Sequence, residues 1–381
     1  MNARPQGWLR VPPPQAGELI SSWLHRLALA NHKTDQTLIT TMFGTGAQIW
    51  TRDTDRSFPV ALEGTLSKWT GVPEARIEAM TLRPMVGRVV EDLIRPGVCG
   101  WILPAGVYHR VRRSPGLQFC PACLAEPPTY ARIAWRQSFV TTCLRHHQEL
   151  LDRCPSCGSV FMFHRMHPDR LGRWPCIGCG RDLRSDRPTA KPLSNTVRLQ
   201  RRMELAAATG GARIDQRWHI SLALFQGVKF LTRVLISAKC QGLLRRKVAL
   251  GCDAAGVATS ARMFEHLPID HRRLLLHAAS CWLVDWPEQF LADVAGEKIM
   301  RSHLIAAGGP APFWMQRALD RLPTAQPHVV TADETQAAAN WVRGSGREVT
   351  RKAIVETLGL TSWEAIMWRN RRALSNTGLG T

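Results

Sequence analysis

The sequence lacks several features that would assign it to a common class of protein. No stretch approaches the ~18–20 apolar residues of a membrane span, and the N-terminal segment MNARPQGWLRVPPPQ has no apolar core of a signal peptide. We therefore expect a cytoplasmic protein with no membrane partner. A Walker A loop, a nucleophile elbow, an HExxH motif and a Gly-rich dinucleotide turn are also missing. We therefore expect a protein that is not an enzyme.

Acidic residues are scarce relative to basic ones. The chain has 30 Asp and Glu against 50 Lys and Arg, which gives a formal net charge of +20, and 42 of the 50 basic residues are arginine. A surface with this excess attracts polyanions, and the guanidinium group suits bidentate contacts with phosphate. Nucleic acid is therefore the partner that the charge favours.

The length and composition predict a folded chain of more than one domain. It has 381 residues, of which 45% are hydrophobic and 21% charged, so a sizeable core can be buried. Composition shifts predict a mainly α fold in three parts. These are a helical, helix-turn-helix-like N-terminal domain (1–95), a tandem zinc-finger or zinc-ribbon module (96–187), and an all-α C-terminal domain with a helix-turn-helix-like end (188–381).

Amphipathic periodicity predicts helices on both sides of the central module. In the N-terminal domain they fall in residues 18–31, 37–44, 62–71 and 72–82. Short helices with tight turns fit a helix-turn-helix and equally fit another compact bundle. In the C-terminal domain the pattern predicts helices in the segments 195–209, 221–238 and 272–286.

The C-terminal tail, TRKAIVETLGLTSWEAIMWRNRRAL (350–374), resembles a second helix-turn-helix. Gly359 allows a turn after one short helix, and Ser362 can cap the next. The alternative is a bundle corner with a solvated basic tip. Six arginines here and before the cysteine cluster are candidate nucleic-acid contacts: Arg110, Arg112, Arg113, Arg369, Arg371 and Arg372.

Four close-set ligand pairs occupy residues 120–179. Eleven cysteines in a reducing compartment indicate metal binding rather than disulfides, and seven of them lie in this segment. With one histidine they supply eight ligands, which is the number that two closed tetrahedral zinc sites need. The pairs, each with a two-residue gap, are Cys120 with Cys123, Cys143 with His146, Cys154 with Cys157, and Cys176 with Cys179.

Three groupings of these pairs are open. The middle two pairs could form one site, leaving the outer pairs to meet each other; the pairs could join sequentially; or they could cross-brace, first with third and second with fourth. Sequential pairing leaves 19 and 18 residues between the halves of each site, which suits one hairpin per site. We expect sequential pairing, although spacing alone does not exclude the cross-brace. His147 competes with His146 as a ligand, and the two-residue gap from Cys143 favours His146. Because every coordination position is filled by protein, both zinc sites are expected to be structural.

Several motifs together resemble the TniQ/TnsD family of transposition proteins. PPPQAGELISSWLHRLA (12–28) is similar to the family's N-terminal signature, and WTGVPEARIEAMTL (69–82) to its second. FCPACL, Trp135, CLRHHQELLDRCPSCG and CIGCG follow in the family's order. The resemblance covers roughly residues 12–183, and it departs at His147, where the family usually has glycine. The positions matched in the first signature are Gly17, Glu18, Ser22, Trp23, Leu24, Arg26 and Ala28.

The resemblance implies a non-catalytic factor for target-site selection in a bacterial transposon. Family members bind target DNA or dock on a CRISPR RNA-guided effector complex, and they recruit an AAA+ ATPase of the TnsC or TniB type; some form homodimers. A zinc-dependent, DNA-binding transcriptional regulator is the main alternative. A nuclease or transposase with an unrecognised acidic triad is a further one.

Overall fold

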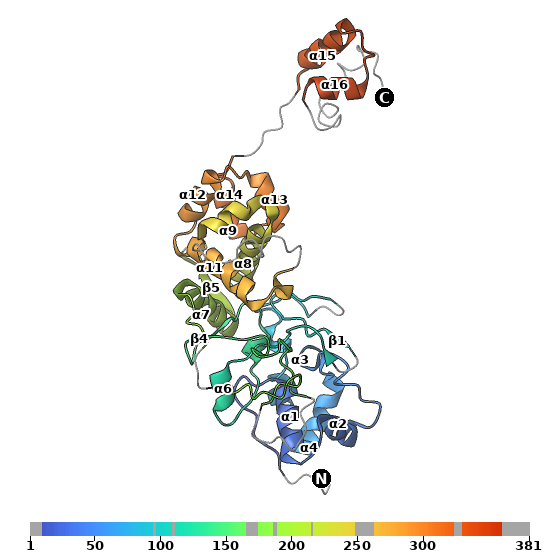
Figure 1. Cartoon of the computed structure of the whole chain (residues 1–381), viewed down its shortest axis with the longest axis vertical. Coiled ribbons are helices and arrows are strands. Elements are labelled where there is room, and N and C mark those ends of the chain that lie inside the picture. Colours follow the sequence, from blue (N-terminus) through green and yellow to red (C-terminus); the bar gives the residue numbers. More distant parts are fainter. Residues whose placement is uncertain are drawn as a thin grey trace. The chain divides into compact units, whose positions relative to one another are not determined.

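Helices are the main regular elements of the described residues, and the strands are few and short (Figure 1). In a computed structural model it divides into two compact units, Met1–Leu322 and Pro323–Thr381, which we call the N-terminal unit and the C-terminal unit. The structure describes residues 10–93, 97–108, 111–164, 174–185, 189–214, 216–247, 263–323 and 330–359.

The first helices of the N-terminal unit form a small bundle with its own core. Trp23 and Leu27 of the first helix are fully buried in it. The Thr34 hydroxyl caps the second helix by accepting the Thr37 N–H, and Gly71 ends a later helix in the left-handed conformation. Helices occur in all four predicted segments: α1 (Ile20–Ala30), α2 (Asp35–Phe43), α4 (Glu63–Thr70) and α5 (Glu74–Glu78), with α3 (Thr54–Ser57) between them.

Loops dominate the central part of the unit. Its regular elements are α6 (Pro121–Ala125) and two short antiparallel pairs, β1 (Val107–Tyr108) with β2 (Val111–Arg112) and β3 (Thr142–Cys143) with β4 (Gln148–Glu149). Although its regular elements are short, this region packs buried side chains such as Leu117, Phe119 and Phe139 into the main core cluster.

The last part of the N-terminal unit is a helical bundle with one β-hairpin. Gly227 lies so close to the Trp314 ring that an added Cβ would come within 2.1 Å of it, which explains a glycine inside a buried helix. The hairpin, β5 (Gly211–Ile214) with β6 (Arg217–Ile220), was not predicted, because both strands are only four residues long. The helices are α7 (Ser194–Thr209), α8 (Ser221–Ile236), α9 (Gln241–Lys247), α11 (Ile269–Val284), α12 (Glu288–Gly296), α13 (Arg301–Gly308) and α14 (Phe313–Leu319).

No single described helix has both the length and the apolar character needed to cross a bilayer. One pair of segments, Ser221–Ile236 and Ala238–Lys247, meets both criteria only when taken together, and the two are bent by 86°.

The C-terminal unit contains α15 (Ala332–Gly344) and α16 (Arg351–Thr357). Thr331 and Glu334 form a capping box at the start of α15. The second tail helix predicted after Ser362 lies outside the described residues.

The division of the chain does not fall at the predicted boundaries near residues 95 and 187. One continuous cluster of buried side chains includes Leu19, Cys120 and Leu322. In addition, Arg136 bonds Asp53 through both terminal nitrogens, at 2.7 and 2.6 Å, which ties the central part to the first helices. These contacts are long-range in sequence, so composition did not indicate them.

Candidate metal centres

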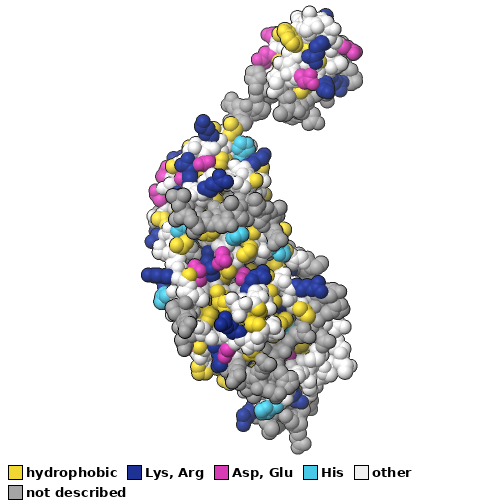
Figure 2. All heavy atoms as spheres, viewed as in Figure 1, with side chains coloured by type: hydrophobic (Ala, Val, Ile, Leu, Met, Phe, Trp, Pro, Cys, Tyr) yellow, Lys and Arg dark blue, Asp and Glu magenta, His cyan; other side chains and the backbone are white. Residues whose placement is uncertain are grey.

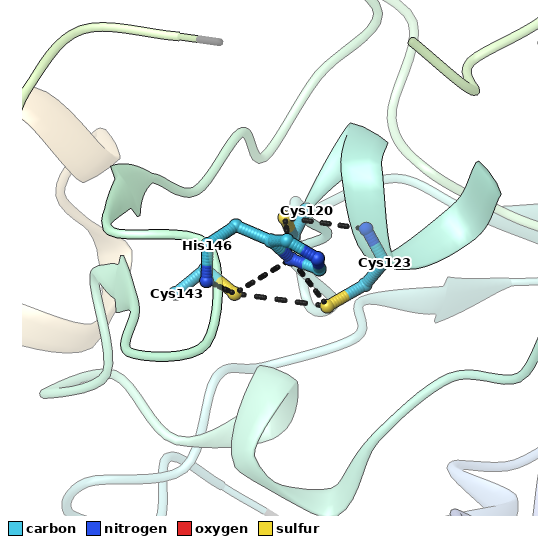
Figure 3. Close-up of side chains that lie close together, drawn as sticks. All are labelled: Cys120, Cys123, Cys143 and His146. Carbon is cyan, nitrogen blue, oxygen red and sulfur yellow. Dashed lines mark hydrogen bonds between the residues drawn. The ribbon is translucent and has the colours of Figure 1, made fainter. Parts of the chain in front are cut away.

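The first ligand cluster contains the first two pairs along the chain, Cys120 with Cys123 and Cys143 with His146. Cys120 caps α6 and accepts the Cys123 N–H at 3.4 Å. Cys143 ends β3, and its sulfur accepts the His146 N–H, also at 3.4 Å. These N–H···S bonds shape each two-residue turn so that both of its side chains point the same way. All four side chains converge on one point (Figure 3).

The spacing of the four ligand atoms fits a single tetrahedral ion. His146 Nδ1 lies 3.4, 3.3 and 3.4 Å from the sulfurs of Cys120, Cys123 and Cys143, and the last two sulfurs are 3.6 Å apart. Ligands placed ~2.3 Å (sulfur) and ~2.0 Å (nitrogen) from a tetrahedral zinc would be separated by about 3.5–3.8 Å. The cluster could therefore hold a metal ion with little rearrangement.

Neighbouring groups orient these ligands. The His146 Nε2 lies 3.1 Å from a Glu126 carboxylate oxygen, which leaves Nδ1 free to face the sulfurs. Gln148 donates from its amide to the Cys120 sulfur at 2.9 Å, and its carbonyl accepts the Thr189 N–H at 3.0 Å. Hydrogen bonding by Cys123 and then Cys143 lowers the pKa of Cys120, while hydrogen bonding with Cys120 raises the pKa values of Cys123 and Cys143, because one thiolate accepts bonds from the other two thiols.

His146, rather than His147, contributes to this cluster. His147 is exposed and has a φ of 51°, in the left-handed region where a side chain is unfavourable and glycine is preferred. This backbone conformation gives a physical reason for the glycine that the TniQ/TnsD resemblance leads one to expect at this position. The His147 side chain is not part of the cluster, in agreement with the two-residue gap that favoured His146.

The second cluster is built from two similar turns. Ser156 donates its N–H to the Cys154 sulfur and Gly178 donates to the Cys176 sulfur, both at 3.4 Å. Each turn closes with a left-handed glycine, Gly158 (φ 72°) and Gly180 (φ 74°). The facing sulfurs are 3.7 Å apart for Cys154 and Cys179, and 3.5 Å for Cys157 and Cys176. This set could likewise hold a metal ion.

The two clusters differ in exposure. Cys120, Cys123 and Cys143 are 0%, 4% and 7% exposed, whereas Cys157 and Cys179 of the second cluster are exposed. Hydrogen bonding with the Ser159 hydroxyl lowers the pKa of Cys157 to about 6. The ligands group sequentially, so neither the cross-brace nor a single site from the two middle pairs occurs among the described residues.

The second cluster connects to the N-terminal helices through aromatic side chains. The Phe161 ring lies 4.8 Å from Phe119, next to the first cluster, and 5.9 Å from Trp174. Phe163 lies 5.4 Å from the His25 ring of α1. The described part of the loop that joins the two turns of the second cluster is therefore anchored in the core.

The arginines predicted to contact nucleic acid fall into three groups. Arg112 is only 4% exposed; its guanidinium lies 3.9 Å from Asp55 and 5.9 Å from the centre of the Phe163 ring. Burial against a carboxylate removes this side chain from any surface phosphate, which corrects the prediction for Arg112. Arg113 is exposed. The other four, Arg110, Arg369, Arg371 and Arg372, lie outside the described residues.

A buried charge network, which the sequence analysis missed, explains where Arg112 lies. Arg136 is fully buried and bonds both Asp53 and Asp55, the latter at 2.9 Å. Burial by itself would raise the pKa of Asp53, but Arg136, and to a lesser extent Arg112, outweigh it and hold this pKa below its ordinary value. Two arginines against two aspartates thus form a compensated interior site.

Comparison with protein-family models gives a match. The TniQ family model matches residues 9–150, a span that contains the whole first cluster and ends before the second. No curated protein matches the chain.

Proposed function

Through residues 9–150 this chain is a member of the TniQ family, and from that premise we propose that it is a non-catalytic adaptor for transposition. In this proposal it selects the target site by binding DNA or an RNA-guided effector complex. It then recruits an AAA+ ATPase of the TnsC or TniB type. The protein would act in the cytoplasm, where target DNA and the other transposition proteins are present.

The observation that carries the proposal is a TniQ domain built around a saturated ligand cluster. Three thiols and one imidazole supply the four positions of a tetrahedral site. No position remains for a water or a substrate, which is the arrangement of a structural site. The net charge of +20 supports a nucleic acid as one partner.

We assign zinc to both clusters. The donor sets, three sulfurs with one nitrogen and four sulfurs, are those that zinc favours in structural sites. When bound, the metal would stabilise turns that bury little apolar surface on their own. Elemental analysis of the purified protein should give about two zinc ions per chain. One zinc, or a different metal in stoichiometric amount, would contradict the assignment.

A reconstituted transposition assay tests the function. It contains the transposase, the AAA+ ATPase, donor ends and a target plasmid, with and without this protein. Omitting the protein should abolish targeted insertion while strand joining by the transposase on pre-cleaved ends continues. The ATPase should also co-purify with the protein.

Two outcomes would contradict the proposal. Metal-dependent DNA cleavage by this protein, abolished by one carboxylate substitution, would indicate a nuclease. Specific binding to a promoter with no effect on insertion would indicate a transcriptional regulator.

A further inference from the structure

The outer face of the β5–β6 hairpin carries large apolar side chains in solvent. Trp218 is 75% exposed and Ile220 is 65% exposed. Both lie on the same side of β6, because side chains alternate along a strand. Arg213 pairs with Trp218 in the register and is also exposed, so the arginine and the tryptophan stand side by side.

The opposite face of the hairpin is anchored. Ala212 and Ile214 are 5% and 2% exposed and belong to the main core. Gly211 has the Trp218 ring 3.4 Å from where its Cβ would be, so glycine leaves room for this ring to lie across the strand. The hairpin is therefore a fixed platform, and substitutions on its outer face should leave the fold intact.

Arginines of α7 extend this surface. Arg198 and Arg201 are exposed, and Leu205, which follows on the same side of the helix, is 64% exposed. Arg202 donates to the Arg213 carbonyl oxygen at 2.6 Å, which joins the helix to the hairpin. Arg217 at the hairpin tip is exposed, but it alternates with Trp218 and pairs with the buried Ile214, so it belongs to the opposite face of the hairpin.

Carboxylates contribute little to this surface. Among the described residues of α7 and the hairpin, the one carboxylate is Glu204, which accepts the Gln200 amide at 2.9 Å. Burial raises the pKa of Glu204. Figure 2 shows that Lys and Arg side chains are also prominent elsewhere on the visible face of the N-terminal unit. The surface is therefore cationic around an aromatic centre.

We propose that the outer face of the β5–β6 hairpin and the exposed side of α7 form a contact surface for duplex DNA. A two-stranded β-ribbon fits the major groove, and arginine binds both phosphates and base edges. In this arrangement Trp218 and Ile220 contact bases and sugars in the groove, while Arg198, Arg201 and Arg213 bind phosphates. This inference rests on the proposed function and assigns its DNA contact to residues outside the matched domain.

Direct binding measurements with three hairpin variants test this surface. The probe is a fluorescein-labelled 30-base-pair duplex, measured by anisotropy at several salt concentrations, with oligo-dT of equal length beside it. Trp218→Ala should weaken duplex binding about tenfold, and Trp218→Phe should restore most of the loss. The triple variant Arg198→Gln, Arg201→Gln, Arg213→Gln should lower the slope of log K against log salt by about 2–3, since each phosphate contact contributes about 0.9.

Matched controls come from the C-terminal unit. Trp341 is 60% exposed, and Arg347 is an exposed arginine paired with Glu356. Trp341→Ala and Arg347→Gln should leave duplex affinity near the wild-type value. Zinc content and circular dichroism of every variant establish that the fold is retained.

Several results would overturn the proposal. If the wild type binds duplex and the hairpin variants bind it equally well, the surface is not the DNA contact, while the adaptor function stands. Oligo-dT bound more tightly than duplex through Trp218 would indicate a single-strand platform. Unchanged duplex binding with loss of ATPase co-purification would indicate a protein-docking surface. If the wild-type protein binds no duplex, both the proposed contact surface and direct DNA binding in the proposed function are refuted.

Discussion

The unequal burial of the two ligand clusters predicts that losing one ligand has very different consequences in each. Cys120 is fully buried, caps α6 and belongs to the main core cluster. Cys179 is exposed, at the edge of a turn. A structural zinc site contributes on the order of 10 kcal/mol to folding, and a folded chain of this kind has a net stability of only about 5–15 kcal/mol.

Cys120→Ser should therefore unfold the N-terminal unit or leave it insoluble, because the metal and a core contact are lost together. Cys179→Ser should release about one zinc and retain the helical circular dichroism signal and the other zinc. Elemental analysis combined with thermal unfolding of each variant measures both effects.

Two cysteines outside the clusters serve as controls. Cys240 is fully buried and Cys281 is half-buried, and neither belongs to a ligand cluster. Cys240→Ala and Cys281→Ser should both keep about two zinc ions. They therefore distinguish the effect of losing a thiol that binds no metal from the effect of losing a metal ligand. The reasoning fails if Cys179→Ser releases both ions, or if Cys120→Ser keeps wild-type stability.

Three further predictions follow from the charged groups. Arg136→Met should lower the free energy of unfolding by about 3–5 kcal/mol in urea titrations, because it removes the nearest cation of Asp53 and Asp55 and leaves the more distant Arg112 to balance two carboxylates. The exposed Arg321→Gln should change this free energy little, and equal effects of the two substitutions would contradict the buried network. Glu126→Gln should weaken metal affinity about 10–100-fold, because Glu126 orients His146. Competition with a chelator measures this affinity, and an unchanged value would refute the orienting role of Glu126. The pKa of Asp53 is lowered in the fold. The ionised Asp53 therefore stabilises the folded state above its unfolded pKa of about 3.9, and this stabilisation is lost as pH falls through the folded pKa. In an acid titration, Asp53→Asn should lose less stability than the wild type below about pH 4, and a curve identical to the wild type would contradict this role of Asp53.

Local sequence patterns were sufficient for the helices and the ligand pairs. The apolar spacing in residues 18–31 reflects one buried helix face, and α1 lies there. The two-residue gap in CPAC and CPSC is a constraint within one turn. It can be recognised without knowing the rest of the fold, so the ligands are identifiable from the sequence.

Contacts between distant segments were not accessible in this way. Arg112 resembled a surface cation, yet it lies beside Asp55, 57 residues earlier in the chain. The β5–β6 hairpin was missed because four-residue strands carry too little alternation to stand out between two helices. The predicted boundaries near residues 95 and 187 likewise cross a continuous core.

The sequence by itself determined the mainly α character, the eight cysteine and histidine residues of the two clusters, the basic charge and the resemblance to the TniQ/TnsD family. Each of these depends on residue identity and short-range spacing. Only the tertiary structure decided that the ligands group sequentially, that His147 has a left-handed backbone conformation, and that Arg112 is buried while Trp218 is exposed. These properties depend on backbone conformation and on which distant side chains meet, and neither is encoded in local spacing.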